Sequence, residues 1–299
     1  MSSKLSINQN QCINCKICVS TCPAKVFAAT DNKVSIQQQK ELFCINCGDC
    51  ISVCPKEAIS NSEIAAEDFQ KDNINFQPEI FLDFLKFRRS VRSYKSNTLS
   101  EYEKNYLEQI ASFVPKGGHT QSIRNTGIVI VENNDLIEKI TDYTYEYMSE
   151  LKKKLSSVWM KIPKAFSTSF RDNIDSTIKR IELALSAKEQ NINLLTYNSP
   201  SLILLHCEKN NPISRENLTV MQYQLMLGAE ALNLGTCFLG WVSFAMQSYK
   251  VKKSDKLKII YDLLKIPGGR ELSGVFSIGQ KTTLYRKPKA RGNAEVTVI

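Results

Sequence analysis

Apolar residues recur with a helical period in several stretches of the chain. This pattern predicts helices over residues 79–88, 100–114 and 214–234, and two long polar-rich helices are expected near 134–156 and 170–190. Ser100 and Glu103 form a capping box at the start of the second of these helices, and Pro115 ends it. The intervening segments are expected to contain the strands.

Short apolar runs between turn residues predict buried strands. They lie at residues 127–131, 201–207, 236–240 and 274–279. Because these strands are few and irregularly spaced among long helices, the expected fold class is α+β and not a doubly wound parallel sheet. No G-x-G-x-x-G sequence opens a helix, which argues against a Rossmann dinucleotide-binding domain.

Eight of the ten cysteines form two copies of one motif, C-x2-C-x2-C-x3-C-P. Zinc sites usually present separate C-x2-C pairs, and a disulfide framework would imply secretion, for which the N-terminal residues show no apolar segment. Three thiolates at x2 spacing can each reach a corner of an iron–sulfur cubane, and the fourth ligand must come from elsewhere in the chain. The motif therefore predicts one-electron chemistry at Cys12, Cys15, Cys18, Cys22, Cys44, Cys47, Cys50 and Cys54.

Residues 5–60 resemble the bacterial two-cluster ferredoxins, in which the last cysteine of each motif serves the other cluster. The resemblance implies two [4Fe-4S] clusters. The first would take Cys12, Cys15, Cys18 and Cys54, and the second would take Cys44, Cys47, Cys50 and Cys22. The implied organisation is a ferredoxin-type module over 1–60, a polar connector over 61–78 and a second domain over 79–299.

Length and charge agree with two domains. The chain has 299 residues and a net charge of +9, whereas residues 1–70 contain six lysines and seven acidic residues. The front of the chain is therefore at −1 and the rest at +10. Scattered basic residues favour a solvated surface with a site for an anionic cofactor over nucleic-acid binding. No run of eighteen apolar residues predicts a membrane helix, and reduced cysteines indicate a cytoplasmic protein.

Four segments of the second domain carry further candidate chemistry. Residues 88–93 present three guanidinium groups and two hydroxyls, which suits a phosphate group. Residues 115–121 form a glycine-containing turn, residues 235–241 turn from a helix into a strand, and residues 284–288 add positive charge near the end of the chain. Cys237 is expected to pack in the core, and a role for His119 is left open between a substrate contact and a solvated side chain.

In order and spacing, these segments look like those of the nitroreductase family of flavin enzymes over residues 80–290. With the cysteine motifs, the chain resembles the ferredoxin-fused nitroreductases of anaerobes. The resemblance implies an α+β homodimer with FMN at the subunit interface. Departures from the family pattern stand at His119, Ser122 and Leu239. The cofactor-binding residues it implies are Arg88, Arg89, Ser90, Arg92, Lys116, Gly117, His119, Leu239, Gly240 and Arg286.

In that family setting, Arg88, Ser90, Arg92 and Arg286 would hold the flavin phosphate and ring edge, and the backbone at 239–240 would face flavin N5. The implied activity is electron transfer from two clusters to FMN and on to nitroaromatic, quinone or similar electron-poor acceptors. The electron donor is left open between NAD(P)H and a ferredoxin. The alternatives are an electron carrier whose second domain binds a partner, and a nitroreductase-fold enzyme for dehalogenation or enone reduction.

Overall fold

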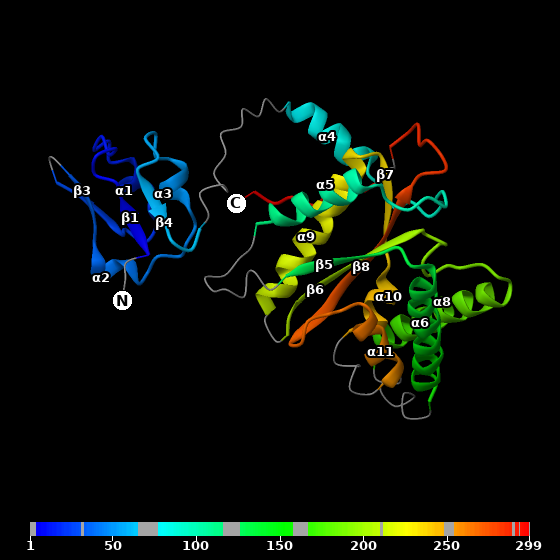
Figure 1. Ribbon diagram of the computed structural model, residues 1–299. Helices are drawn as coiled ribbons and strands as arrows, with labels where there is room; N and C mark the ends of the chain where they lie inside the picture. Colours follow the sequence, from blue (N-terminus) through cyan, green and yellow to red (C-terminus); the bar gives the residue numbers. More distant parts are fainter. Residues whose placement is uncertain are drawn as a thin grey trace. The chain divides into compact units, whose positions relative to one another are not determined.

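The computed structural model describes residues 4–30, 33–64, 77–115, 126–157, 167–209, 212–247, 254–288, 291–292 and 294–298 (Figure 1). The chain divides into two compact units, Met1–Gln77 and Pro78–Ile299. Most of the predicted connector, residues 65–76, lies outside the described residues. None of the helices described is both long and apolar enough to cross a membrane.

The N-terminal unit contains two short antiparallel strand pairs. Strand β1 (Leu5–Ile7) pairs with β4 (Ile59–Asn61), and β2 (Phe27–Ala29) pairs with β3 (Val34–Ile36). Its small apolar core is built around these strands and the cysteines. A core of this size is usually supplemented by metals or disulfides in small modules. Short helices complete the unit, namely α1 (Ile17–Thr21), α2 (Gln38–Glu41) and α3 (Asp49–Ser52).

The C-terminal unit is built on an antiparallel sheet of order β5-β6-β8-β7. The strands are β5 (Gly127–Val131), β6 (Ser201–Glu208), β7 (Leu234–Phe238) and β8 (Arg270–Gln280). Although β8 comes last in the chain, it lies inside the sheet between β6 and β7. The sheet is therefore incomplete until the C-terminal part of the chain is in place.

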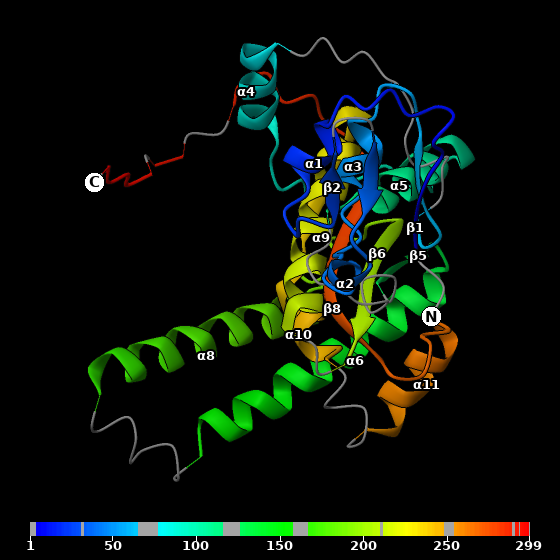
Figure 2. The ribbon, with the colours of Figure 1, turned by 90° about the vertical axis from the view of Figure 1, so that its left-hand side faces the viewer.

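Helices cover both faces of this sheet (Figures 1 and 2). Leu202 and Leu204 of β6 face one core, whereas Ile203 and Leu205 face the other, as the two-residue period of a strand requires. Helix α4 (Pro78–Phe87) has no buried residue. The core that contains Ile203 and Leu205 is covered by α5 (Glu101–Ser112) and α9 (Pro212–Ala231). The core that contains Leu202 and Leu204 is covered by α6 (Asn134–Leu155), α8 (Thr168–Glu189), α10 (Gly240–Ala245) and α11 (Asp255–Leu263).

The α+β fold class is confirmed, and the structure contains all of the predicted helices and strands; β5 has the predicted bounds, whereas the others have shifted ends. The capping box is present, because the Ser100 hydroxyl accepts from the Glu103 N–H and the Glu103 carboxylate accepts from the Ser100 N–H. The helix predicted over 214–234 ends at Ala231, because Asn233 adopts a left-handed conformation (φ 59°) just before β7. Strand β8 is longer than predicted, and the short helices α10 and α11 were not predicted.

Candidate functional site

The eight motif cysteines line two small cavities of the N-terminal unit. Cys12, Cys15, Cys18 and Cys54 line the first cavity together with apolar residues such as Ile7. The remaining four motif cysteines line the second, together with Leu5 and Phe27; they are Cys22, Cys44, Cys47 and Cys50. The fourth cysteine of each motif thus lies with the first three cysteines of the other motif.

The pKa values of the thiols reflect the same grouping. The pKa of Cys50 is raised to about 11, mainly by burial and also by the charges of Cys47, Cys44 and Cys22. Burial also raises the pKa of Cys18, with added contributions from Cys15 and Cys12. Such thiols lose their protons when a metal binds, because the thiolate is the ligand form.

Each cysteine set suits an iron–sulfur cluster in its chemistry, with four sulfur donors and an apolar lining. Among the described residues, no group of three or more His, Cys, Asp or Glu side chains is arranged to hold a single metal ion. The assignment of ligands therefore rests on how the cysteines divide between the cavities and not on preformed coordination.

In the C-terminal unit, residues 88–93, called the arginine segment below, run along the edge of β7. Ser90 forms a parallel bridge with Thr236, and the Val91 N–H donates to the Thr236 carbonyl at 2.9 Å. Val91 is fully buried against Gly235, where a Cβ atom would lie 2.7 Å from Val91 Cγ1. Only glycine at position 235 lets the segment approach β7 this closely.

Two buried side chains at this edge have polar atoms without hydrogen-bond partners in the part of the chain described. These atoms are Nε and Nη1 of Arg88 and Oγ1 of Thr236. Arg88 is only 9% exposed, and its guanidinium lies 5.8 Å from the ring centroid of Tyr223. An unsatisfied buried polar group costs about 1–3 kcal/mol, more if it is charged. The edge therefore fits a ligand with anionic oxygen atoms.

Arg92 lies further along the same segment, with its guanidinium 5.5 Å from the ring centroid of Tyr197. A hydrogen bond with Tyr197 raises the pKa of Arg92. Burial raises the pKa of Cys237, while Arg92, Ser90 and Arg88 act to lower it. Cys237 is thus buried, as expected, and its thiol also lies beside the arginine segment.

Leu239 and Gly240, the two positions predicted to face the flavin, differ in whether their backbone is open to a ligand. The Leu239 N–H is committed to the sheet, because it donates to the Val275 carbonyl at 3.0 Å. Gly240 opens α10, where backbone N–H groups have no acceptor within the helix. A Cβ atom at Gly240 would meet nothing within 4 Å. Of the two positions, Gly240 is the one with open space above its backbone.

The C-terminal segment reaches the arginine segment through residues that were only partly predicted. Arg291 Nη2 donates to the Arg88 carbonyl at 2.6 Å, and the Arg89 guanidinium lies 4.0 Å from the ring centroid of Tyr285. Arg286 is exposed and has no described contact with the arginine segment. The other predicted cofactor residues, Lys116, Gly117 and His119, lie outside the described residues.

Sequence reasoning missed Tyr197 and Arg291. Tyr197 is remote from Arg92 in the sequence, and no local motif marks it. Arg291 follows the basic segment at 284–288. The positive charge of that region indicated a basic contact near the end of the chain, but the prediction named Arg286 and not Arg291.

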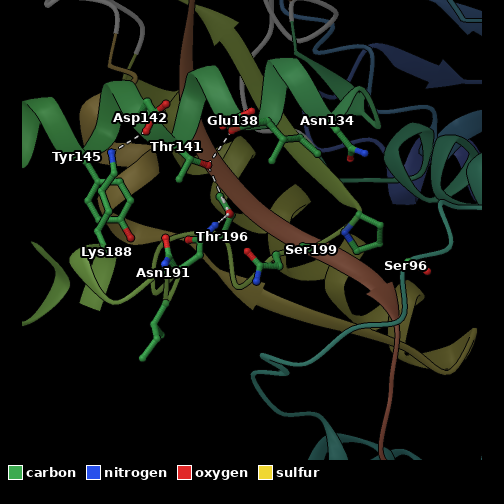
Figure 3. A pocket seen from close by; sticks show the side chains of 15 residues that line it. Ser96, Asn134, Glu138, Thr141, Asp142, Tyr145, Lys188, Asn191, Thr196 and Ser199 are labelled. Atoms are coloured by element: carbon green, nitrogen blue, oxygen red, sulfur yellow. Dashed lines mark hydrogen bonds and ion pairs between the residues drawn. The ribbon is translucent and has the colours of Figure 1, made fainter. Parts of the chain in front are cut away.

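A polar cavity of about 560 Å³ lies between α6 and the segment that follows α8 (Figure 3). Thr141 and Thr196 meet in its wall, with their hydroxyl oxygens 3.4 Å apart. Lys188, the cation of its described lining, pairs with Asp142 at 2.7 Å. No predicted cofactor residue lines this cavity, but Thr196 in its wall is the chain neighbour of Tyr197.

His206 lies near the C-terminal end of β6, paired with Leu272 of β8, and its burial predicts a pH dependence of stability. It is buried, and burial together with Arg270 lowers its pKa to about 4. The unfolded chain, with a histidine pKa near 6.5, therefore binds more protons between pH 6.5 and pH 4. The free energy of unfolding should fall by up to about 3 kcal/mol as the pH is lowered through this window.

Denaturant unfolding monitored by tryptophan fluorescence at several pH values checks this expectation. A His206→Gln variant should lose this part of the pH dependence, whereas His119→Gln should retain it. An unchanged pH slope in His206→Gln would contradict the buried neutral state of His206.

Comparison with known proteins supports the two-part reading. Residues 85–280 match the model of the nitroreductase family, and residues 11–59 match that of the 4Fe-4S dicluster domain. None of the curated proteins compared with the chain matches it.

Solved structures share the fold of the C-terminal unit. A nitroreductase with bound FMN from Desulfitobacterium hafniense has a TM-score of 0.54 at 15% identity, over 73% of this chain and 97% of that one. A BluB-like flavoprotein from Clostridium difficile has a TM-score of 0.52 at 18% identity, over 71% and 94%. A second FMN-bound nitroreductase, from Bacteroides fragilis, has a TM-score of 0.51 at 15% identity, over 73% and 97%.

The family match spans more than half of the chain and includes the sheet and the arginine segment. The chain therefore belongs to the nitroreductase family and carries a 4Fe-4S ferredoxin-type unit at its N-terminal end.

Proposed function

We propose that the chain transfers electrons from two [4Fe-4S] clusters to FMN and on to small electron-poor acceptors such as nitroaromatics or quinones. Family membership makes the chain an FMN-dependent oxidoreductase. The observation that carries the proposal is the buried Arg88 beside Thr236, whose Nε and Nη1 have no hydrogen-bond partner among the described residues, in a chain whose other unit gathers eight cysteines in two sets of four.

The edge of β7 supports FMN as the ligand. Arg88, Thr236 and Ser90 would hold the phosphate, since a guanidinium and two hydroxyls can donate to its oxygens. Arg92, oriented by Tyr197, would place positive charge near the ring edge that becomes electron-rich on reduction. Bound FMN supplies the exchange between one-electron and two-electron transfer. The protein contributes the phosphate anchor, the positive charge and the open backbone at Gly240.

The two cysteine sets support two clusters. Cys12, Cys15, Cys18 and Cys54 would hold one, and Cys22, Cys44, Cys47 and Cys50 the other. Each cluster carries one electron, so two clusters in one chain can store the pair that an organic acceptor requires. The covalent link between the two units raises the effective concentration of this donor to the order of mM.

A homodimer is supported by the face that carries Tyr223. Ile213, Val220 and Tyr223 are large, exposed side chains on α9, and such groups of apolar residues mark interaction surfaces. Tyr223 also contacts Arg88. A second copy that covered α9 would therefore shield the phosphate end of the FMN site from water.

The proposal is tested on anaerobically prepared full-length protein. Iron, sulfide and FMN are measured per chain, and the reduced protein is mixed with nitroaromatic, quinone, haloaromatic and enone acceptors. We expect eight irons, one FMN and turnover with nitroaromatics or quinones. A brown protein without flavin would contradict the FMN site. Full cofactor content with no turnover on any acceptor would instead favour an electron carrier.

A further inference from the structure

We propose that the two cluster sites differ in reduction potential, and that the site of Cys12, Cys15, Cys18 and Cys54 is reduced first because two lysines line it. This inference rests on the proposed pair of clusters. The site with two lysines is called the lysine site below. The site of Cys22, Cys44, Cys47 and Cys50 is called the aspartate site, because Asp49 lines it.

The two sites share one backbone design, which makes a position-by-position comparison meaningful. Asn14 and Asn46 occupy equivalent motif positions and have φ angles of 56° and 53°. The equivalent residues Lys25 and Glu57 both have φ 51°.

The sulfur environments match at the second and fourth cysteines of the motifs, whereas Cys18 is buried and Cys50 is only partly buried. The fourth cysteine of each motif accepts a backbone hydrogen bond at similar length, from Val26 to Cys22 Sγ at 3.4 Å and from Ala58 to Cys54 Sγ at 3.3 Å. Cys15 and Cys47, the second cysteines of the two motifs, are both exposed. Backbone geometry and these two pairs of cysteines therefore do not distinguish the sites.

The charged side chains that line the cavities do distinguish them. Lys16 and Lys56 line the lysine site, whereas Gly48 and Ala24 occupy the equivalent positions of the aspartate site. Conversely, Asp49 lines the aspartate site where Ile17 lines the lysine site. The charges in the linings are thus +2 and −1.

Two other charges oppose this difference, because Lys25 and Glu57 stand three residues after Cys22 and Cys54, but neither residue lines a cavity. Lys4 interacts with Cys44 of the aspartate site, but it forms an ion pair with Glu63 at 2.7 Å and also interacts with Glu41. This group of three therefore brings no net positive charge to the aspartate site.

The charges set the order of reduction by simple electrostatics. Reduction adds one negative charge to a cluster, so adjacent positive charge stabilises the reduced form and raises its potential, and negative charge lowers it. Lys16, Lys56 and Asp49 are exposed, so water and salt reduce the size of the effect but not its sign. The first electron should reside at the lysine site, and the aspartate site should be the stronger reductant.

Potentiometric titration of the full-length protein, followed by electron paramagnetic resonance, tests this order. We expect two separate reduction waves from the clusters of the unmodified protein. Lys16→Gln and Lys56→Gln should each lower the potential of the upper wave and leave the lower wave in place. Asp49→Asn should raise the lower wave only. Lys33→Gln is the matched control, because Lys33 lines neither cavity, and it should move neither wave.

The outcomes separate this inference from the proposed function. Reduction of both clusters at the same potential, or lysine variants that shift the lower wave, would overturn the order of reduction. Four irons per chain would remove the two-cluster premise, and the inference would fall with it. The expected shifts in a protein that reduced no acceptor would support the inference while contradicting the proposed enzyme activity.

Discussion

Replacing Arg88 with leucine is expected to weaken FMN binding by about 10-fold to 100-fold, because charge-assisted hydrogen bonds contribute about 1.5–3 kcal/mol each. The FMN-free protein should nevertheless be at least as stable as the unmodified FMN-free protein. The reason is that leucine removes buried guanidinium nitrogens that have no partner among the described residues. Equilibrium dialysis with FMN and thermal unfolding with and without FMN measure the two effects.

The two readouts together separate a ligand-binding role from a structural one. Arg180→Leu is the matched control, because Arg180 is exposed on α8 and should leave both FMN affinity and stability unchanged. If Arg88→Leu lowered the stability of the FMN-free protein and left FMN affinity intact, Arg88 would be a structural residue and the phosphate assignment would be wrong.

Serine in place of Cys22 is expected to remove the same cluster as serine in place of Cys50, although the two residues belong to different motifs. Both line the same cavity, whereas Cys54 lines the other cavity with Cys18. Each single substitution should reduce the iron content by about half and destabilise the N-terminal unit strongly, since cluster binding contributes directly to folding in such small modules. Iron analysis and electron paramagnetic resonance of each variant check this.

Double variants serve as the internal control for the crossed arrangement. Cys22→Ser with Cys50→Ser should retain as much iron as either single variant, because only one site is damaged. Cys22→Ser with Cys54→Ser should lose nearly all iron. Equal iron content in the two double variants would show that ligands are not divided as the cavities suggest.

Local sequence signals predicted much of the fold. The capping box at Ser100 and the apolar run at 127–131 define helix and strand starts that the structure reproduces. The end of α9 was less predictable, because the apolar pattern continues through Leu232 and Leu234 although Asn233 turns the chain into β7. The apolar pattern alone does not show whether such a residue belongs to the end of the helix or to the strand that follows.

The candidate site was predicted only where its residues are close in sequence. Arg88, Ser90 and Arg92 share one segment, and their phosphate-binding chemistry could be recognised from that segment alone. The packing of this segment against Gly235 and the contact between Arg92 and Tyr197 depend on the path of the whole chain. A sequence pattern carries no information about such long-range pairs, so Tyr197 and Arg291 emerged only from the structure.

The internal position of β8 delays completion of the C-terminal unit until late in synthesis. Its partners β6 and β7 are both made earlier, and the sheet lacks the strand that joins them until residues 270–280 have left the ribosome. The cysteines of the N-terminal unit emerge long before that point. Domains generally fold as units, N-terminal first, so the nascent chain can acquire iron and sulfide while its catalytic half is still unfolded.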